Sequence, residues 1–175
     1  MNSDALDGDA LDRTDSPEVA APVTLYAVRH AEKGSGPNPS LTEQGRVRAN
    51  ALAETLDSIP IEVIFSSDYL RCQETVSPVA SKKSLEPTLI EAADPHRQIA
   101  ALHQLPAGSV ALLCGHANTV PLLVQALGGV CPDLEFGMFP ESAYDRLLKI
   151  TFVPGGSEPG RTQVEVRHYG ETCGR

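Results

Sequence analysis

The fold is decided by the stretch Thr24-Leu25-Tyr26-Ala27-Val28-Arg29-His30-Ala31-Glu32-Lys33-Gly34, a short apolar run that ends in a cluster of ionisable side chains. The apolar residues are too few for a helix and are typical of a buried strand, and glycines and a proline follow within residues 34–37. Because ligands of open α/β sheets bind at the carboxyl ends of strands, we expect a reacting group beside Arg29 and His30. An isolated Arg-His pair would be interpreted as surface residues, so this hypothesis depends on the rest of the chain.

Length and charge limit the classes of protein that this chain can represent. The chain has 175 residues, 41% of them hydrophobic, which suits one domain with a sizeable core. The formal net charge of −9 argues against nucleic acid or an anionic membrane as the main partner. Much of that charge comes from six carboxylates and one arginine in the first 22 residues, so the remainder is only mildly acidic. We therefore expect no nucleic-acid partner and no membrane association.

The chain starts with a polar segment in which Asp-Ala-Leu-Asp recurs at residues 4–7 and 9–12. Such a composition predicts a disordered acidic tail over residues 1–21, followed by a single domain over residues 22–175. No apolar run approaches the roughly 20 residues of a membrane span, and the start does not resemble a secretory signal, so we expect a cytoplasmic protein. The four cysteines form no Cys-x-x-Cys pair, which favours free thiols, with disulfides as the alternative.

A helix is predicted after the first strand, from about residue 42 to residue 57. Ser40 or Thr42 can cap it, and its expected apolar stripe consists of Val47, Leu52, Ala53 and Leu56.

A second strand is predicted over residues 61–65, and it ends in Ser66-Ser67-Asp68. Arg71 falls in the first turn of the next helix, which should reach about residue 80. Because a helix start presents unpaired N–H groups and the positive end of the helix dipole, Arg71 belongs to a natural anion site.

The rest of the sheet comes from the second half of the chain. A third buried strand is predicted over residues 110–113, with His116 at its end and an apolar helix from about residue 118 to 127. Before it we expect a short strand over residues 85–90 and a helix beginning at Asp94. After it we expect two antiparallel strands, over residues 147–153 and 164–169. Three strands are thus expected to end in Arg-His, in Ser-Ser-x-x-x-Arg and in Gly-His.

These three segments together resemble, in order and spacing, the signature segments of the histidine phosphatase superfamily, also called phosphoglycerate mutase-like. They read Arg29-His30-Ala31-Glu32-Lys33, Ser66-Ser67-x-x-x-Arg71-x-x-x-Thr75 and Gly115-His116-Ala117-Asn118-Thr119. The resemblance implies that His30 is the nucleophile that accepts phosphate, and that Arg29, Arg71 and His116 hold the phosphoryl group. One departure is Ala31, where much of the family has glycine; alanine is acceptable there if its φ is not positive.

The chemistry of these residue types agrees with that implication. A phosphoryl group in transfer carries charge on its equatorial oxygens, which two guanidinium groups and a second imidazole can stabilise. A neutral imidazole can attack phosphorus and form a covalent phosphohistidine. We therefore expect no metal and no cofactor, since the cationic side chains do the work that Mg²⁺ does elsewhere.

The general acid is less well defined by the sequence. The family has a carboxylate between the residues matching Arg71 and His116, and Glu91 is our prediction for it, with Asp94 and then Glu32 as alternatives. Asp94 before Pro95 can equally be a helix cap. The remaining predicted substrate contacts are Lys33, Asn38 and Ala117.

We therefore expect a three-layer α/β/α sandwich whose sheet is mostly parallel with one antiparallel strand. The expected activity is hydrolysis of phosphomonoesters or of protein phosphohistidine, so the partner is a phosphorylated small molecule or a phosphohistidine protein. The superfamily's mutases carry longer insertions, whereas only about 45 residues separate Arg71 from His116 here, which favours an open site and a phosphatase. The alternative is a non-catalytic phosphate- or phosphoprotein-binding module of the same fold.

Overall fold

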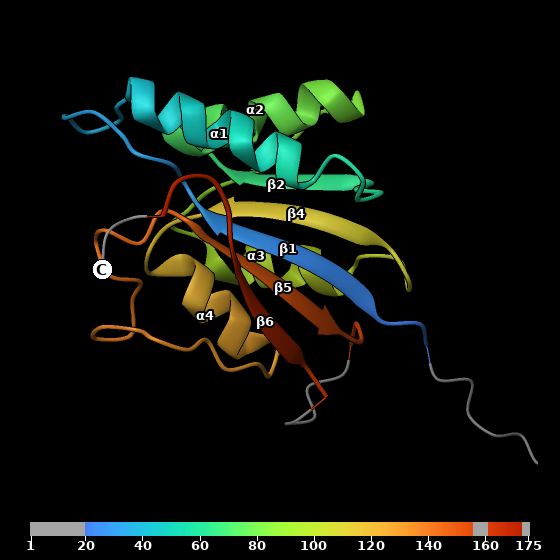
Figure 1. The fold of residues 1–175 in the computed structure, drawn as a ribbon. Helices are drawn as coiled ribbons and strands as arrows, with labels where there is room; N and C mark the ends of the chain where they lie inside the picture. Colours follow the sequence, from blue (N-terminus) through green and yellow to red (C-terminus); the bar gives the residue numbers. More distant parts are fainter. Residues whose placement is uncertain (1–19, 156–160, 173–175) are drawn as a thin grey trace, which may run out of the picture.

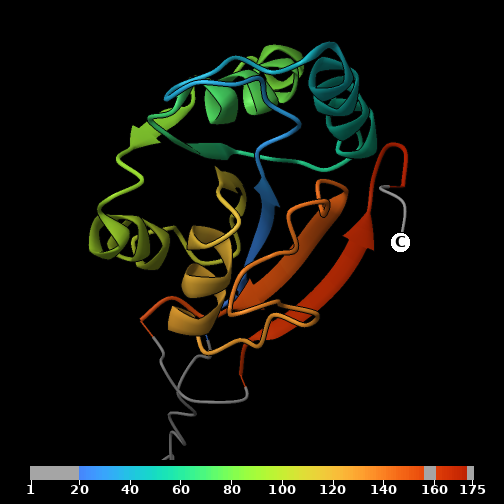
Figure 2. The same cartoon turned by 90° about the vertical axis from the view of Figure 1, so that its left-hand side faces the viewer.

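The fold is seen in a computed structural model that describes residues 20–155 and 161–172. Nearly all of the predicted acidic tail lies outside the described residues, so its disorder stays a prediction. Figures 1 and 2 show the arrangement of the elements in two views.

A single six-stranded sheet runs through the described part of the chain, in the order β3-β2-β4-β1-β5-β6. β1 is central and pairs in parallel with β4 and antiparallel with β5, while β5 and β6 form a further antiparallel pair. β5 therefore runs opposite to the other five strands, as predicted. The strands are β1 (Val23–Arg29), β2 (Val63–Ser67), β3 (Thr88–Ile90), β4 (Val110–Gly115), β5 (Arg146–Phe152) and β6 (Gln163–His168).

The helices cover both faces of this sheet (Figure 1). α1 (Glu43–Thr55) and α2 (Leu70–Lys83) lie on one face, and α3 (Pro95–His103) and α4 (Thr119–Ala126) lie on the other. Alternate residues of β1 supply both hydrophobic layers: Tyr26 and Val28 pack with α1 and α2, whereas Leu25 and Ala27 pack with α3 and α4. This alternation is what a strand buried on both faces requires. The predicted three-layer sandwich is confirmed.

Details of α1 differ from the expected stripe. Thr42 caps the helix by accepting a hydrogen bond from the Gly45 N–H, which is one of the two predicted caps. Val47 was predicted to face the core but is 57% exposed, because the packed face of α1 runs through Gly45, Arg48, Ala49, Leu52 and Ala53. Arg48 lies on that face and can be buried because it forms an ion pair with Glu32. The apolar pattern alone therefore misplaced one residue of the stripe.

Other boundaries shift by a few residues. The strand predicted over residues 85–90 forms only at β3, and α2 continues three residues past the predicted end. Asp94 caps α3 by accepting a hydrogen bond from the Arg97 N–H, with Pro95 in the first turn. None of the helices in the described ranges is both long and apolar enough to cross a membrane.

Candidate active site

Three strand ends meet at one edge of the sheet. β4 lies between β1 and β2, and the three strands run in parallel, so their carboxyl ends point to the same side (Figure 1). The His30 N–H donates to the Gly115 carbonyl at 3.0 Å, which joins the end of β1 to the end of β4. The imidazole rings of His30 and His116 lie with centroids 5.4 Å apart. Residues far apart in the sequence are thus brought together as the three motifs predicted.

A cavity of about 390 Å³ opens above these strand ends. His30, Arg71, His116 and Ala117, all predicted site residues, line it. The other lining residues are Tyr69, Ala92, Ala93, Asn118 and Thr119. None of the residues that line this cavity is a carboxylate.

The His30 ring is fixed in one tautomer by the backbone. Its Nδ1 lies 2.8 Å from the Ala31 carbonyl oxygen, which can only accept, so Nδ1 carries the proton and Nε2 keeps its lone pair. The Ala31 N–H in turn donates to Thr75 Oγ1 at 2.9 Å, so both sides of this residue are held. Ala31 is not among the residues with positive φ, which explains why alanine fits where much of the family has glycine. The arrangement leaves Nε2 of His30 as a free nucleophilic atom.

Burial keeps this imidazole neutral. It lowers the pKa of His30 from 6.5 to about 3; the hydrogen bond to Ala31 opposes the shift, and the charges of Arg29, His116 and Arg71 add to it. A protonated imidazole has no lone pair for attack, so the low pKa preserves the nucleophilic form over a wide pH range.

The same burial should make stability depend on pH. The unfolded chain binds more protons than the folded chain between pH values of about 6.5 and 3, so the contribution of His30 is present above 6.5 and is lost as the pH falls. One proton corresponds to a slope of at most about 1.4 kcal/mol per pH unit. We expect the free energy of unfolding, measured by urea titration, to fall less steeply with decreasing pH in His30→Gln than in the wild type. Equal slopes would show that His30 titrates normally.

His116 is oriented by hydrogen bonds on both ring nitrogens. Nδ1 lies 3.3 Å from Arg71 Nη2, which can only donate, so Nδ1 accepts and Nε2 carries the proton. Nε2 then donates to Ser67 Oγ at 2.9 Å. The His116 N–H donates to Thr119 Oγ1 at 2.9 Å. Ser67 and Thr119 were quoted within the motifs but no role was predicted for them; the structure gives both a part in orienting His116.

Arg29 is held by the loop that precedes β5. Its Nη1 donates to the carbonyls of Pro140 and Glu141, at 3.2 and 2.8 Å, and its Nη2 lies 3.4 Å from the Tyr144 hydroxyl. Arg29 is only 7% exposed and does not line the cavity itself. These contacts span more than 100 residues of sequence, so no local pattern could have predicted them.

Two guanidinium donors of the site have no acceptor. The Nε atoms of Arg29 and Arg71 are buried, and no residue of the described chain accepts a hydrogen bond from either. Buried donors are nearly always paired, because an unpaired one costs about 1–3 kcal/mol. An anion with several oxygens could accept from these donors once the side chains that cover them move.

The carboxylates considered as the general acid lie in different settings. Glu91 is exposed at the end of β3, directly before Ala92 and Ala93, which line the cavity. Asp94 is the cap of α3, and both oxygens of Glu32 accept from Arg48 Nε at 2.9 Å. Glu91 is thus the one of the three carboxylates that is not already committed to a cap or to Arg48, and its role stays a prediction.

The predicted substrate contacts are dispersed. Ala117 lines the cavity, whereas Lys33 is exposed on the loop after the nucleophile. The Oδ1 of Asn38 accepts from the Leu70 N–H at 3.0 Å, at the start of α2 and next to Tyr69 and Arg71 of the cavity lining; its contact with substrate stays a prediction.

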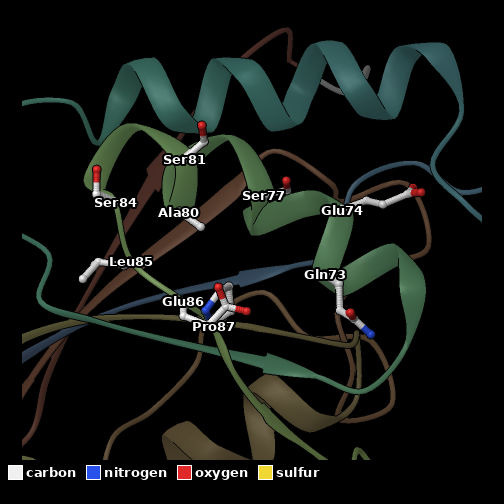
Figure 3. A pocket seen from close by; sticks show the side chains of 9 residues that line it. All are labelled: Gln73, Glu74, Ser77, Ala80, Ser81, Ser84, Leu85, Glu86 and Pro87. Carbon is white, nitrogen blue, oxygen red and sulfur yellow. The ribbon is translucent and has the colours of Figure 1, made fainter.

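A larger cavity of about 660 Å³ lies between α2 and residues 84–87 (Figure 3). Its lining contains serines and two glutamates, such as Ser77, Ser81 and Glu86, but no cationic side chain and no motif residue. It therefore offers nothing that suits an anion. Among the residues that the structure describes, no three histidine, cysteine or acidic side chains are grouped so as to hold a metal ion.

Comparisons with known proteins agree with this geometry. The sequence profile of the histidine phosphatase superfamily (branch 1) matches residues 25–94. No curated protein sequence matches the chain significantly.

Solved structures with the same fold cover more than four-fifths of the chain. The protein histidine phosphatase SixA, complexed with tungstate, superposes with a TM-score of 0.65 at 19% identity, over 83% of this chain and 96% of that one. A mycobacterial glucosyl-3-phosphoglycerate phosphatase gives 0.64 at 16% identity, over 84% and 99%. A phosphoglycerate mutase from Plasmodium falciparum gives 0.55 at 18% identity, over 86% and 91%. At these identities the likeness establishes the fold.

Proposed function

We propose that the chain is a member of the histidine phosphatase superfamily, and that it is a metal-independent phosphatase that works through a covalent phosphohistidine on His30. The observation that carries the proposal is the pairing of a neutral nucleophile with unpaired cationic donors. Nε2 of His30 has a free lone pair, and the buried Nε–H groups of Arg29 and Arg71 lack acceptors among the described residues.

The proposed reaction has two displacements at phosphorus. Nε2 of His30 attacks the phosphoryl group, and an N–P bond forms as the bond to the leaving group breaks; the leaving group departs with the electron pair and takes up a proton. Water then attacks the phosphohistidine, the N–P bond breaks, and phosphate leaves with His30 neutral again. Arg29 and Arg71 stabilise the oxygens of the phosphoryl group in both steps, and His116 holds Arg71 beside them. Because these cations supply the electrostatic stabilisation, activity should persist in EDTA.

The residues that line the cavity indicate which leaving groups the proposed reaction can use. An alkoxide leaving group needs a proton as its bond breaks, and a general acid accelerates that step by about 10²–10⁴-fold. No carboxylate lines the cavity, although Glu91 lies one residue before its lining. A phosphohistidine substrate needs no such acid, because an imidazole protonated in solution leaves as a neutral group. The lining therefore favours protein phosphohistidine, or esters with good leaving groups, over alkyl phosphates.

A leaving-group comparison in excess EDTA tests the proposal and the role of Glu91. We expect the wild type to hydrolyse p-nitrophenyl phosphate and a phosphohistidine peptide. If Glu91 is the acid, Glu91→Gln should slow hydrolysis of glycerol phosphate by about 10²-fold or more and barely affect p-nitrophenyl phosphate. Asp94→Asn is the matched control and should leave both rates nearly unchanged.

Each other outcome of this comparison has a defined meaning. A reversed pattern assigns the acid to Asp94. If neither variant changes hydrolysis of an alkyl phosphate that the wild type cleaves well, Glu32 is the next candidate. If the protein binds vanadate but turns over none of these substrates, it is a non-catalytic phosphate-binding module and not a phosphatase.

A further inference from the structure

Each of the two site arginines, Arg29 and Arg71, lies over a tyrosine ring. The guanidinium carbon of Arg29 is 4.2 Å from the centroid of the Tyr144 ring, and that of Arg71 is 4.2 Å from the centroid of the Tyr69 ring. Each tyrosine also lies near one of the two histidines: Tyr69 and His116 have centroids 5.1 Å apart, and Tyr144 and His30 6.2 Å. The same Arg-Tyr-His grouping thus occurs on both sides of the site, built from unrelated parts of the chain.

The two tyrosines come from elements with no sequence relation. Tyr69 is the residue immediately before α2, and Tyr144 is on the loop before β5 that also holds Arg29. Tyr69 lines the cavity, and the hydroxyl of Tyr144 lies 3.4 Å from Nη2 of Arg29.

The contacts of the two site arginines leave the same atom unpaired. Nη atoms of Arg29 bind the 140–144 loop, and Nη2 of Arg71 binds His116. With one face of each guanidinium covered by a ring, the Nε–H edge is the part that finds no acceptor among the described residues.

A tyrosine ring supports an arginine in a way that a carboxylate cannot. Within the described ranges, the ion pairs closer than 4.0 Å involve Arg48, Lys82, Arg167 and His168, but neither of the two site arginines. A carboxylate would neutralise the guanidinium and use its N–H donors, so that it would compete with phosphate. A ring face attracts the cation through its quadrupole and uses none of the in-plane donors.

We propose that Tyr69 and Tyr144 are positioning residues that fix the two site arginines without neutralising them. This inference rests on the proposed function, since the oriented donors are those that bind the phosphoryl group. The rings hold each guanidinium group in place before the anion arrives, which reduces the ordering needed on binding.

The test is the affinity for orthovanadate, measured by calorimetry, in variants that remove the ring or only the hydroxyl. Tyr69→Leu and Tyr144→Leu should each weaken vanadate binding by about 3- to 30-fold, the range expected for a partly desolvated cation–π contact. Tyr69→Phe keeps the ring and should bind like the wild type. Phe136→Leu removes a fully exposed aromatic side chain outside the site and serves as the control.

A double-mutant cycle distinguishes positioning from general packing. If Tyr69 acts through Arg71, Tyr69→Leu should have almost no further effect on kcat/KM in an Arg71→Ala background, because the effects of coupled residues do not add. The same holds for Tyr144 and Arg29. Thermal midpoints confirm that the variants are folded.

The failure of this inference differs from the failure of the proposed function. If the leucine variants bind vanadate as tightly as the wild type, the tyrosines have no positioning role. The same conclusion follows if Tyr69→Leu lowers kcat/KM by the same factor in the Arg71→Ala background as in the wild type. If the wild type binds no vanadate, the phosphate site itself is wrong and this inference falls with it.

Discussion

His30→Ala is expected to reduce hydrolysis of p-nitrophenyl phosphate by on the order of 10⁴- to 10⁶-fold, the loss typical of removing a covalent nucleophile. The expectation follows from the state of the ring. Its Nδ1 is committed to the Ala31 carbonyl, its pKa is lowered to about 3, and it lines the cavity, so Nε2 is the neutral atom available to attack. Alanine at position 30 leaves the site arginines in place but provides no nitrogen atom to form the N–P bond.

His96→Ala is the matched control, because His96 is exposed on α3 and takes no part in the site. It should retain wild-type turnover. Both variants should give the same circular dichroism spectrum as the wild type and His30→Ala should still bind vanadate, which separates loss of chemistry from loss of structure. Turnover in His30→Ala within about tenfold of the wild type would end the covalent mechanism.

Replacing either of the two site arginines should have the next largest effect. Losing one charge-assisted donor in a site shielded from water costs several kcal/mol of transition-state binding, so Arg29→Ala and Arg71→Ala should lower kcat/KM by about 10²–10³-fold. Arg29→Lys and Arg71→Lys should recover only part, because an ammonium group is a point charge that cannot present the same donors in one plane.

The two arginines should differ in their effect on stability. Arg29 is bonded to the carbonyls of residues 140 and 141, so Arg29→Ala should also destabilise that loop, whereas Arg71 is half-buried and is held mainly by His116 and Tyr69. Arg48→Lys, at a buried arginine outside the cavity, is the control for losing a guanidinium as such. If Arg29→Lys and Arg71→Lys both have the kcat/KM of the wild type, the site needs only positive charge at these positions and not the planar set of guanidinium donors.

The sequence predicted the parts of the site that lie at strand ends. Arg29, His30 and His116 each follow a short apolar run, and the order of the runs predicts parallel neighbours whose ends meet. The same runs also predicted that β1 is a buried strand, and nearly all of its residues are buried. The one antiparallel strand was predictable from the turn signals between the two late strands.

Other residues were beyond sequence reasoning because their contacts are not local. Pro140 and Tyr144 hold Arg29 across 111 and 115 residues, so the sequence around them could not show that they bind Arg29. Thr75 was part of a quoted motif, but its hydrogen bond to the Ala31 N–H needs the packing of α2 against the end of β1. Val47 shows the opposite failure, because it was predicted as part of the apolar stripe of α1 but lies outside the packed face and is exposed.

The central claim is that phosphate is bonded to His30 during turnover, and trapping that bond tests it most directly. Wild-type protein mixed with a phosphohistidine peptide or p-nitrophenyl phosphate, and quenched rapidly in base, should carry one phosphoryl group that is stable in base and lost in acid. Mass spectrometry of the digested protein should locate it on the peptide that contains His30. No labelled peptide under conditions of measured turnover, or a label on any residue other than His30, would contradict the account.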